Sequence, residues 1–183
     1  MKKIAAVLAF ALSTAAFAQG RLVINNYSAY DFRGDVIAHN MTSPCYPRVG
    51  NNTPIIVPAD AHMGNGNHLQ YDNFRDQFGL SLYPTSNWTI ATGPNSTTVS
   101  PWDDPSLVPG GTLSNTTLWN VAKFGMVYPG TTTGVPGFGA TLAVGLNPCY
   151  ASPDNFTTSN GLNSGEIFII TGGGSSTTYL QIY

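Results

Sequence analysis

Short runs of apolar or alternating residues, separated by turn-forming residues, make up most of the chain after residue 19. Alternation with a period of two is typical of strands that bury one face, and Gly, Pro, Asn and Asp between such runs favour turns. Strong helix formers are scarce in this part of the chain. The pattern predicts strands at Arg21–Asn26, Asp31–His39, Pro54–Pro58, Phe78–Tyr83, Trp88–Thr92, Thr97–Ser100, Thr117–Val127, Ala140–Leu146, Glu166–Thr171 and Thr177–Tyr183.

Many short strands with frequent turns indicate an all-β fold, and we expect a single-domain antiparallel β-sandwich, with a β-barrel as the alternative. The last two predicted strands form the clearest pair. The segment between them, Gly172–Ser176, contains three glycines that can adopt positive φ. We therefore expect Glu166–Thr171 and Thr177–Tyr183 to form a hairpin.

The N-terminal segment has the order of a secretory signal peptide. Two lysines precede the apolar run Ile4–Leu12, and small residues follow at Ala16 and Ala18. We expect cleavage between residues 18 and 19, which leaves one β-sandwich domain at 19–183. The apolar run is shorter than the ~20 residues that span a bilayer, so no membrane span is expected after signal removal. The short basic start is typical of bacteria, and the expected location is secreted, periplasmic or on the cell surface.

The sequence has two cysteines, Cys45 and Cys149. In an oxidising compartment a lone pair of this kind favours a disulfide, which would close a loop of roughly 100 residues. The alternatives are two free buried thiols or, less plausibly at this spacing, a metal site.

Charge excludes some partners. The expected leader contains two of the seven basic residues, so five basic residues remain against nine acidic ones, a net charge of −4. Phosphate binding needs clustered cations, and the remaining ones are dispersed along the sequence, so no nucleic-acid partner is expected. These cations are Arg21, Arg33, Arg48, Arg75 and Lys123.

One segment offers metal ligands. His62, His68 and Asp72 lie close together in sequence, and imidazole and carboxylate groups bind metals. The spacing matches no standard site, and the glycines between the histidines favour a solvated loop as the alternative.

A second segment offers a binding surface. Asp103 and Asp104 supply adjacent carboxylates, and calcium, a candidate cofactor, prefers such oxygen ligands. The alternative is a structural turn, because an Asp before Pro is common in turns. Trp102 is the best exposed candidate for stacking on a sugar, whereas Trp88 and Trp119 lie in predicted strands and are expected in the core.

The sequence contains no nucleophile elbow, phosphate loop or evident pair of catalytic carboxylates. Three functions follow as hypotheses. The leading one is a secreted, non-catalytic β-sandwich that acts by surface binding or assembly, with a surface glycan, another protein or a second copy of itself as partner. The alternatives are a secreted hydrolase with an unrecognised Asp/His site and a small outer-membrane β-barrel.

The layout of the mature chain resembles a loose group of small uncharacterised secreted proteins of Gram-negative bacteria with one predicted disulfide. The matching pieces are Cys45, Trp119–Val121, Val144–Cys149 and Leu180–Ile182. The group often has a further cysteine near the position of Ser28–Tyr30, which this chain lacks. The resemblance implies no activity and no site residues.

Overall fold

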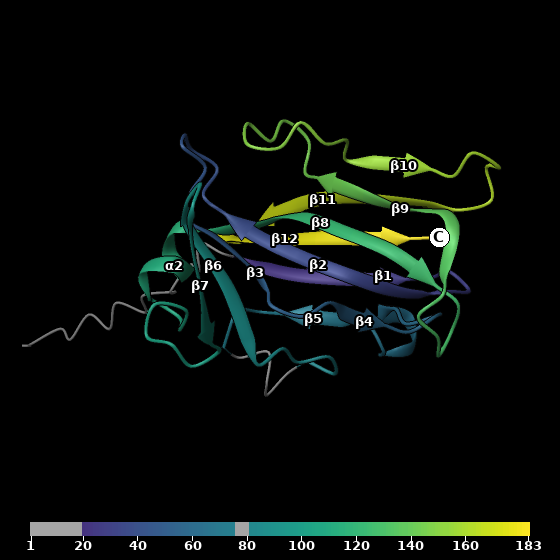
Figure 1. Cartoon of the computed structure of the whole chain (residues 1–183), viewed down its shortest axis with the longest axis horizontal. Coiled ribbons are helices and arrows are strands. Elements are labelled where there is room, and N and C mark those ends of the chain that lie inside the picture. The colour runs from purple at the N-terminus through teal and green to yellow at the C-terminus, as the bar shows by residue number, and fades with distance from the viewer. Residues whose placement is uncertain (1–19, 76–80) are drawn as a thin grey trace, which may run out of the picture.

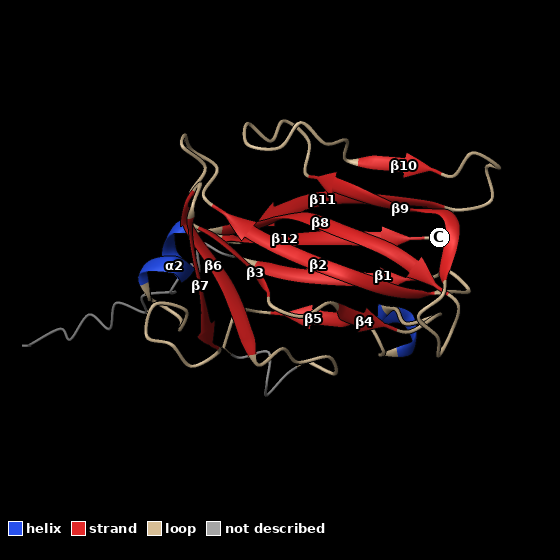
Figure 2. Ribbon diagram, viewed as in Figure 1, coloured by secondary structure: helices blue, strands red, loops and turns tan. Residues whose placement is uncertain are grey.

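Two β-sheets packed face to face make up the protein, which was analysed as a computed structural model (Figures 1 and 2). The structure describes residues 20–75 and 81–183. The predicted signal peptide at 1–18 and the first part of the predicted strand Phe78–Tyr83 lie outside the described residues. Of the two architectures expected from the sequence, the sandwich is the one that the structure shows.

The larger sheet has seven strands. Along its main path the order is β7-β6-β3-β2-β8-β9, and β4 pairs with β2 beside β3. All of its pairings are antiparallel. The strands are β2 (Asp31–His39), β3 (Arg48–Asn51), β4 (Ile55–Val57), β6 (Asn87–Gly93), β7 (Ser96–Pro101), β8 (Leu118–Val127) and β9 (Gly134–Ala143).

The smaller sheet has five strands in the order β10-β11-β12-β1-β5. They are β1 (Arg21–Asn26), β5 (Leu69–Tyr71), β10 (Asn155–Thr157), β11 (Ser164–Gly172) and β12 (Ser175–Ile182). The first and last strands pair in parallel, which departs from a purely antiparallel sandwich. Local alternation carries no information about the direction in which strands distant in the chain will pair, so the sequence could not predict this.

The predicted hairpin is confirmed as β11–β12. Its turn is shorter than expected, because Gly173 and Gly174 alone connect the strands, with φ values of 61° and 81°. Positive φ at both central residues suits the tight turn that matches strand twist.

The sequence pattern missed the three short strands β3, β5 and β10. Each has only three or four residues, too few for alternation to stand out. The described end of the predicted strand Phe78–Tyr83, residues 81–83, is not a strand.

A cluster of aromatic rings fills the space between the sheets. Trp88 and Trp119 are fully buried, as predicted, with ring centroids 5.7 Å apart. Phe74 lies 5.0 Å from Trp88 and 5.1 Å from Trp119, and Tyr71 also contacts both rings. Such rings contribute large buried areas and preferred edge-to-face geometries, so this cluster is a main source of stability.

Helical structure is limited to a 3₁₀ turn, Met63–Asn65, and one short helix, α2 (Thr112–Thr116), within the described residues. Neither is long or apolar enough to cross a membrane.

Candidate functional site

The outward face of the larger sheet carries a groove that follows β2. Alternation along β2 buries Phe32, Gly34 and Val36 and leaves Arg33 and Asp35 half-exposed on the opposite face. Two neighbouring hollows of about 430 and 220 Å³ both include Asp35 in their walls. We call this double hollow the β2 groove; its main lining residues are Arg33, Asp35, Lys123 and Gly125 at one end and Ile37, Arg48, Gly50, Thr89 and Tyr150 at the other.

Three charged side chains meet at the wider end of the groove. Lys123 on β8 lies directly opposite Asp35 on β2, and Arg33 lies one outward position further along β2. Diagonal neighbours of this kind are about 7–8 Å apart. Among the described residues, the side chains of Arg33 and Lys123 form no hydrogen bond or ion pair, so both cationic groups are available to a ligand.

Asn51 holds Asp35 in place. Its side-chain Nδ2 donates hydrogen bonds to Asp35 Oδ1 (2.9 Å) and to the carbonyls of Gly34 and Thr53, while its Oδ1 accepts from Val36 N (2.7 Å). The asparagine thus replaces ladder hydrogen bonds in the gap where β2 changes partner from β3 to β4. The centre of the groove is therefore rigid.

Arg48 closes the narrower end. Its guanidinium carbon lies 4.6 Å from the ring centre of Tyr46 and 5.0 Å from that of Tyr150. Nε donates to the Cys45 carbonyl and Nη1 to the Tyr150 hydroxyl. Since arginine has five N–H donors, others remain free for a ligand.

The predicted disulfide is confirmed and lies beside this end of the groove. Cys45 and Cys149 are bonded, with their Cα atoms 5.7 Å apart. The bond ties the segment that carries Tyr150 to the segment that precedes β3, and so fixes one wall of the groove.

His39 lies fully buried behind the same wall. Its Nδ1 bonds to the Asn40 carbonyl (2.8 Å), its Nε2 faces the Asn147 amide (3.3 Å), and its ring contacts Tyr150. Burial lowers the pKa of His39, the Asn40 hydrogen bond opposes this effect, and the positive charge of Arg48 adds to it. Burial therefore disfavours the charged form of the imidazole.

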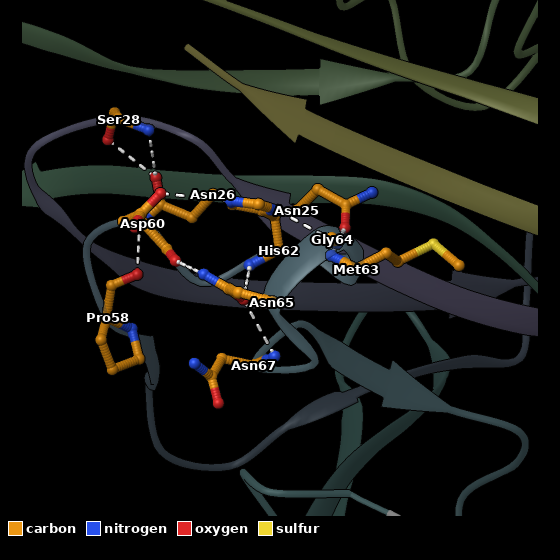
Figure 3. A network of polar contacts seen from close by, with 10 residues as sticks. All are labelled: Asn25, Asn26, Ser28, Pro58, Asp60, His62, Met63, Gly64, Asn65 and Asn67. Carbon is orange, nitrogen blue, oxygen red and sulfur yellow. Dashed lines mark hydrogen bonds and ion pairs between the residues drawn. The ribbon is translucent and has the colours of Figure 1, made fainter.

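The candidate metal ligands fall into two sets: His62 bonds within its own loop, whereas Gln70 links His68 to Asp72. His62 bonds to Asp60 through Nε2 (3.2 Å) and accepts from Gly64 N through Nδ1 (3.1 Å), as part of the loop network drawn in Figure 3. His68 Nε2 faces Gln70 Oε1 (3.3 Å), and Gln70 Nε2 donates to both carboxylate oxygens of Asp72 (3.1 Å each), which also pairs with Arg21. Within residues 20–75 and 81–183, no three His, Cys, Asp or Glu side chains converge as a metal-binding group.

Figure 3 also shows why this loop is ordered. Asn25 on β1 accepts a hydrogen bond from Met63 N, and Asn65 donates to the Asp60 carbonyl and accepts from His62 N. The ring of His62 stacks on that of Tyr27 (centroids 4.6 Å apart). These contacts give His62 a role in holding the loop against the smaller sheet.

The segment with Trp102, Asp103 and Asp104 forms a turn after β7. Trp102 is half-buried and packs against the core. Asp104 Oδ1 accepts from Ser106 Oγ (2.6 Å) and N (2.9 Å), and these hydrogen bonds lower the pKa of that carboxyl. Asp103 is exposed. Calcium binding and sugar stacking here stay predictions.

The sequence reasoning missed the β2 groove because its cations are distant in sequence. Arg33, Arg48 and Lys123, three of the five basic residues after the expected leader, gather on one face through strand pairing. The available signal was local: Arg33 and Asp35 occupy alternate positions of a predicted strand, and Lys123 interrupts another. Only the register of β2 on β8 reveals that they are neighbours.

Comparisons with models of known protein families, with curated proteins and with solved structures find no match.

Proposed function

We propose that this is a secreted, non-catalytic binding protein that holds its ligand in the β2 groove. The observation that carries the proposal is the presence of two cationic groups, Arg33 and Lys123, without described partners beside an open hollow. They stand on central strands of a sheet whose other face is the hydrophobic core. A rigid support of this kind limits the entropy that side chains lose when a ligand binds.

The surroundings of the histidines favour binding over hydrolysis. His68 has one ring nitrogen without a partner among the described residues, Nδ1, but that atom is buried. A general base needs a ring nitrogen free to take a proton from a nucleophile. Both ring nitrogens of His62 bond within its own loop, and His39 is buried with both nitrogens occupied. The Asp60–His62 pair therefore suits a structural role.

The signal-like leader and the disulfide together support a location outside the cytoplasm. Disulfides persist in oxidising compartments and are rare in the cytosol. The Cys45–Cys149 bond also fits a binding protein that must stay folded without chaperones.

A steric variant tests the proposal without changing charge. A Cβ at Gly125 would meet no atom within 4 Å, so Gly125→Val places a side chain in the groove and leaves the core intact. Gly93→Val, on the β6–β7 hairpin, is the matched control, because a Cβ there has only an ordinary contact with Ser96. Affinity electrophoresis against a panel of polysaccharides should show retention of the wild-type protein and the control that Gly125→Val abolishes. Equal retention of Gly125→Val and Gly93→Val contradicts the proposal, as does a wild-type protein that none of the polysaccharides retains.

One observation favours assembly as a second candidate function. Strand β7 is an edge of the larger sheet, and every residue in it is exposed or half-buried. Unpaired edges of this kind can join a second copy through backbone hydrogen bonds. Sedimentation velocity tests this: a dimer that Val99→Pro, which removes an N–H pointing away from β6, converts to a monomer supports it, and a monomeric wild-type protein at high concentration contradicts it.

A further inference from the structure

The cations of the β2 groove are spread along its length. Arg33 lies near one end of β2, whereas Arg48 pairs with His39, six residues further along the same strand. At the rise of a strand this separation is about 20 Å. A single small molecule would not reach both ends, so the spacing suits an extended ligand.

The groove is positive in a protein that is negative overall. Arg33, Lys123 and Arg48 face the single carboxylate of Asp35 among the lining residues, a local net charge of +2. The formal net charge of the whole chain is −2. Such a contrast concentrates the attraction for anions at this surface.

The backbone under the groove disfavours an extended peptide. Strand β2 pairs with β8 on one side and with β3 and β4 on the other, so it offers no free edge for an added strand. Apolar groups such as Ile37 and Pro54 line the floor beside Gly50 and Gly125, but both hollows are open to solvent and neither encloses an anchoring side chain. The groove is better suited to a ligand recognised through polar groups along its length.

Polar side chains of the groove suit sugar hydroxyls. Asp35 accepts hydrogen bonds, Thr89 Oγ1 donates to Asn52 Oδ1 (3.0 Å) and can still accept from a sugar hydroxyl, and Tyr150 offers part of an aromatic ring. Guanidinium groups match carboxylates in a bidentate geometry, and the lysine supplies a point charge.

Building on the proposed function, we propose that the β2 groove binds an acidic polysaccharide, a chain of sugars that bear carboxylates. Arg33 and Lys123 contact one carboxylate, Arg48 contacts another, and Asp35 and Thr89 bond to hydroxyls between them. Because the carboxylate contacts are partly solvated, the affinity should fall as salt is added.

The test measures fluorescence anisotropy of labelled hexagalacturonate at low salt. The variant Arg33→Gln/Lys123→Gln should bind at least about tenfold more weakly than the wild-type protein, since it loses charge-assisted hydrogen bonds. The matched control is Arg21→Gln/Arg75→Gln, which removes the same charge elsewhere and should bind within about twofold of the wild-type protein. Equal melting temperatures of the two variants establish that both are folded.

Competing ligands separate the ligand class from the proposed function. A carboxyl-reduced hexasaccharide and hexaglutamate should both compete poorly. If the carboxyl-reduced sugar instead binds, and its binding is abolished by Gly125→Val but not by Arg33→Gln/Lys123→Gln, the ligand is not an acidic polysaccharide. In that case the proposal that the β2 groove binds a ligand stands. If hexaglutamate competes as well as the acidic sugar, recognition is of charge alone and the polysaccharide assignment is wrong. If hexagalacturonate does not bind, or if neither groove variant weakens its binding, the inference is overturned.

Discussion

On β2, Phe32, Val36 and Ala38 point inward and are completely buried, whereas Arg33 and Asp35 alternate with them and point outward. The same strands therefore present an apolar core on one face and, on the other, a groove whose lining combines apolar groups with a net positive charge. Apolar burial supplies most of the folding free energy, whereas half-exposed charges contribute little. Outward charged residues such as Arg33 are therefore available to bind a ligand, because the folding free energy depends little on them.

The sharpest contrast comes from neighbours on β6. Trp88→Ala removes a fully buried ring and should lower the free energy of unfolding by about 3–5 kcal/mol. Thr89→Ala, one residue further and on the groove face, should cost less than about 0.5 kcal/mol. Urea denaturation followed by circular dichroism measures both. If Trp88→Ala does not fold, Trp88→Phe, which loses the Nε1 hydrogen bond to Phe74, replaces it. Equal losses of unfolding free energy in Trp88→Ala and Thr89→Ala would contradict the difference between the core face and the groove face.

The disulfide should affect both stability and binding. Cys45→Ala/Cys149→Ala opens a loop of 104 residues and should lower the free energy of unfolding by about 2–5 kcal/mol. It also frees the segment of Tyr150, so affinity for the groove ligand should fall even at temperatures where the protein is folded. Wild-type protein with and without a reducing agent provides the control. An unchanged urea midpoint contradicts the prediction.

Asn51 is where the two faces meet, since its buried amide supports an outward carboxylate. Asn51→Ala leaves Val36 N and the Gly34 carbonyl without their partner and should cost about 1–3 kcal/mol. Asn52→Ala, at the exposed neighbouring position, should cost less than about 0.5 kcal/mol. Thermal denaturation compares them. A loss of stability in Asn52→Ala as large as that in Asn51→Ala would show that the gap in the β2 ladder does not need the hydrogen bonds of the Asn51 side chain.

His39 should give the smallest effect, and one that depends on pH. Its pKa is lower in the folded protein than in the unfolded chain, so the unfolded chain binds the proton first as pH falls. The free energy of unfolding should be unaffected by this group well above pH 6.5 and fall below it, by at most about 1.4 kcal/mol per pH unit. Urea denaturation between pH 4.5 and 8 measures the slope. His39→Gln should flatten it, and an unchanged slope in that variant contradicts the assignment.

The sequence predicted the fold class well but the groove poorly. Alternation located most of the long strands, although the predicted run Ala140–Leu146 covers only the end of β9 (Gly134–Ala143). The two glycines at the β11–β12 turn located the hairpin, and both signals are local. Which strands become neighbours depends on the packing of the whole core. The meeting of Arg33, Asp35 and Lys123 and the parallel pairing of β1 with β12 depend on such neighbours, so neither is visible in a single sequence.

The candidate residues chosen from the sequence show the same limit. The disulfide was predictable because two cysteines allow one pairing. His62, His68 and Asp72 are close in sequence, yet His62 bonds within its own loop, and His68 and Asp72 are linked only through Gln70, since alternate residues of a strand point to the same face. Proximity along a β-rich chain is therefore weak evidence for a shared site.

The most direct test of the account maps the ligand on the protein. Amide chemical shifts are recorded by NMR while unlabelled hexagalacturonate is added to the protein. If the ligand lies in the β2 groove, the largest changes follow the groove, at outward positions of β2 and at the facing residues of β3 and β8, centred on Asp35. Changes centred on the His62 loop or on the turn at Trp102, with none along β2, would contradict this placement.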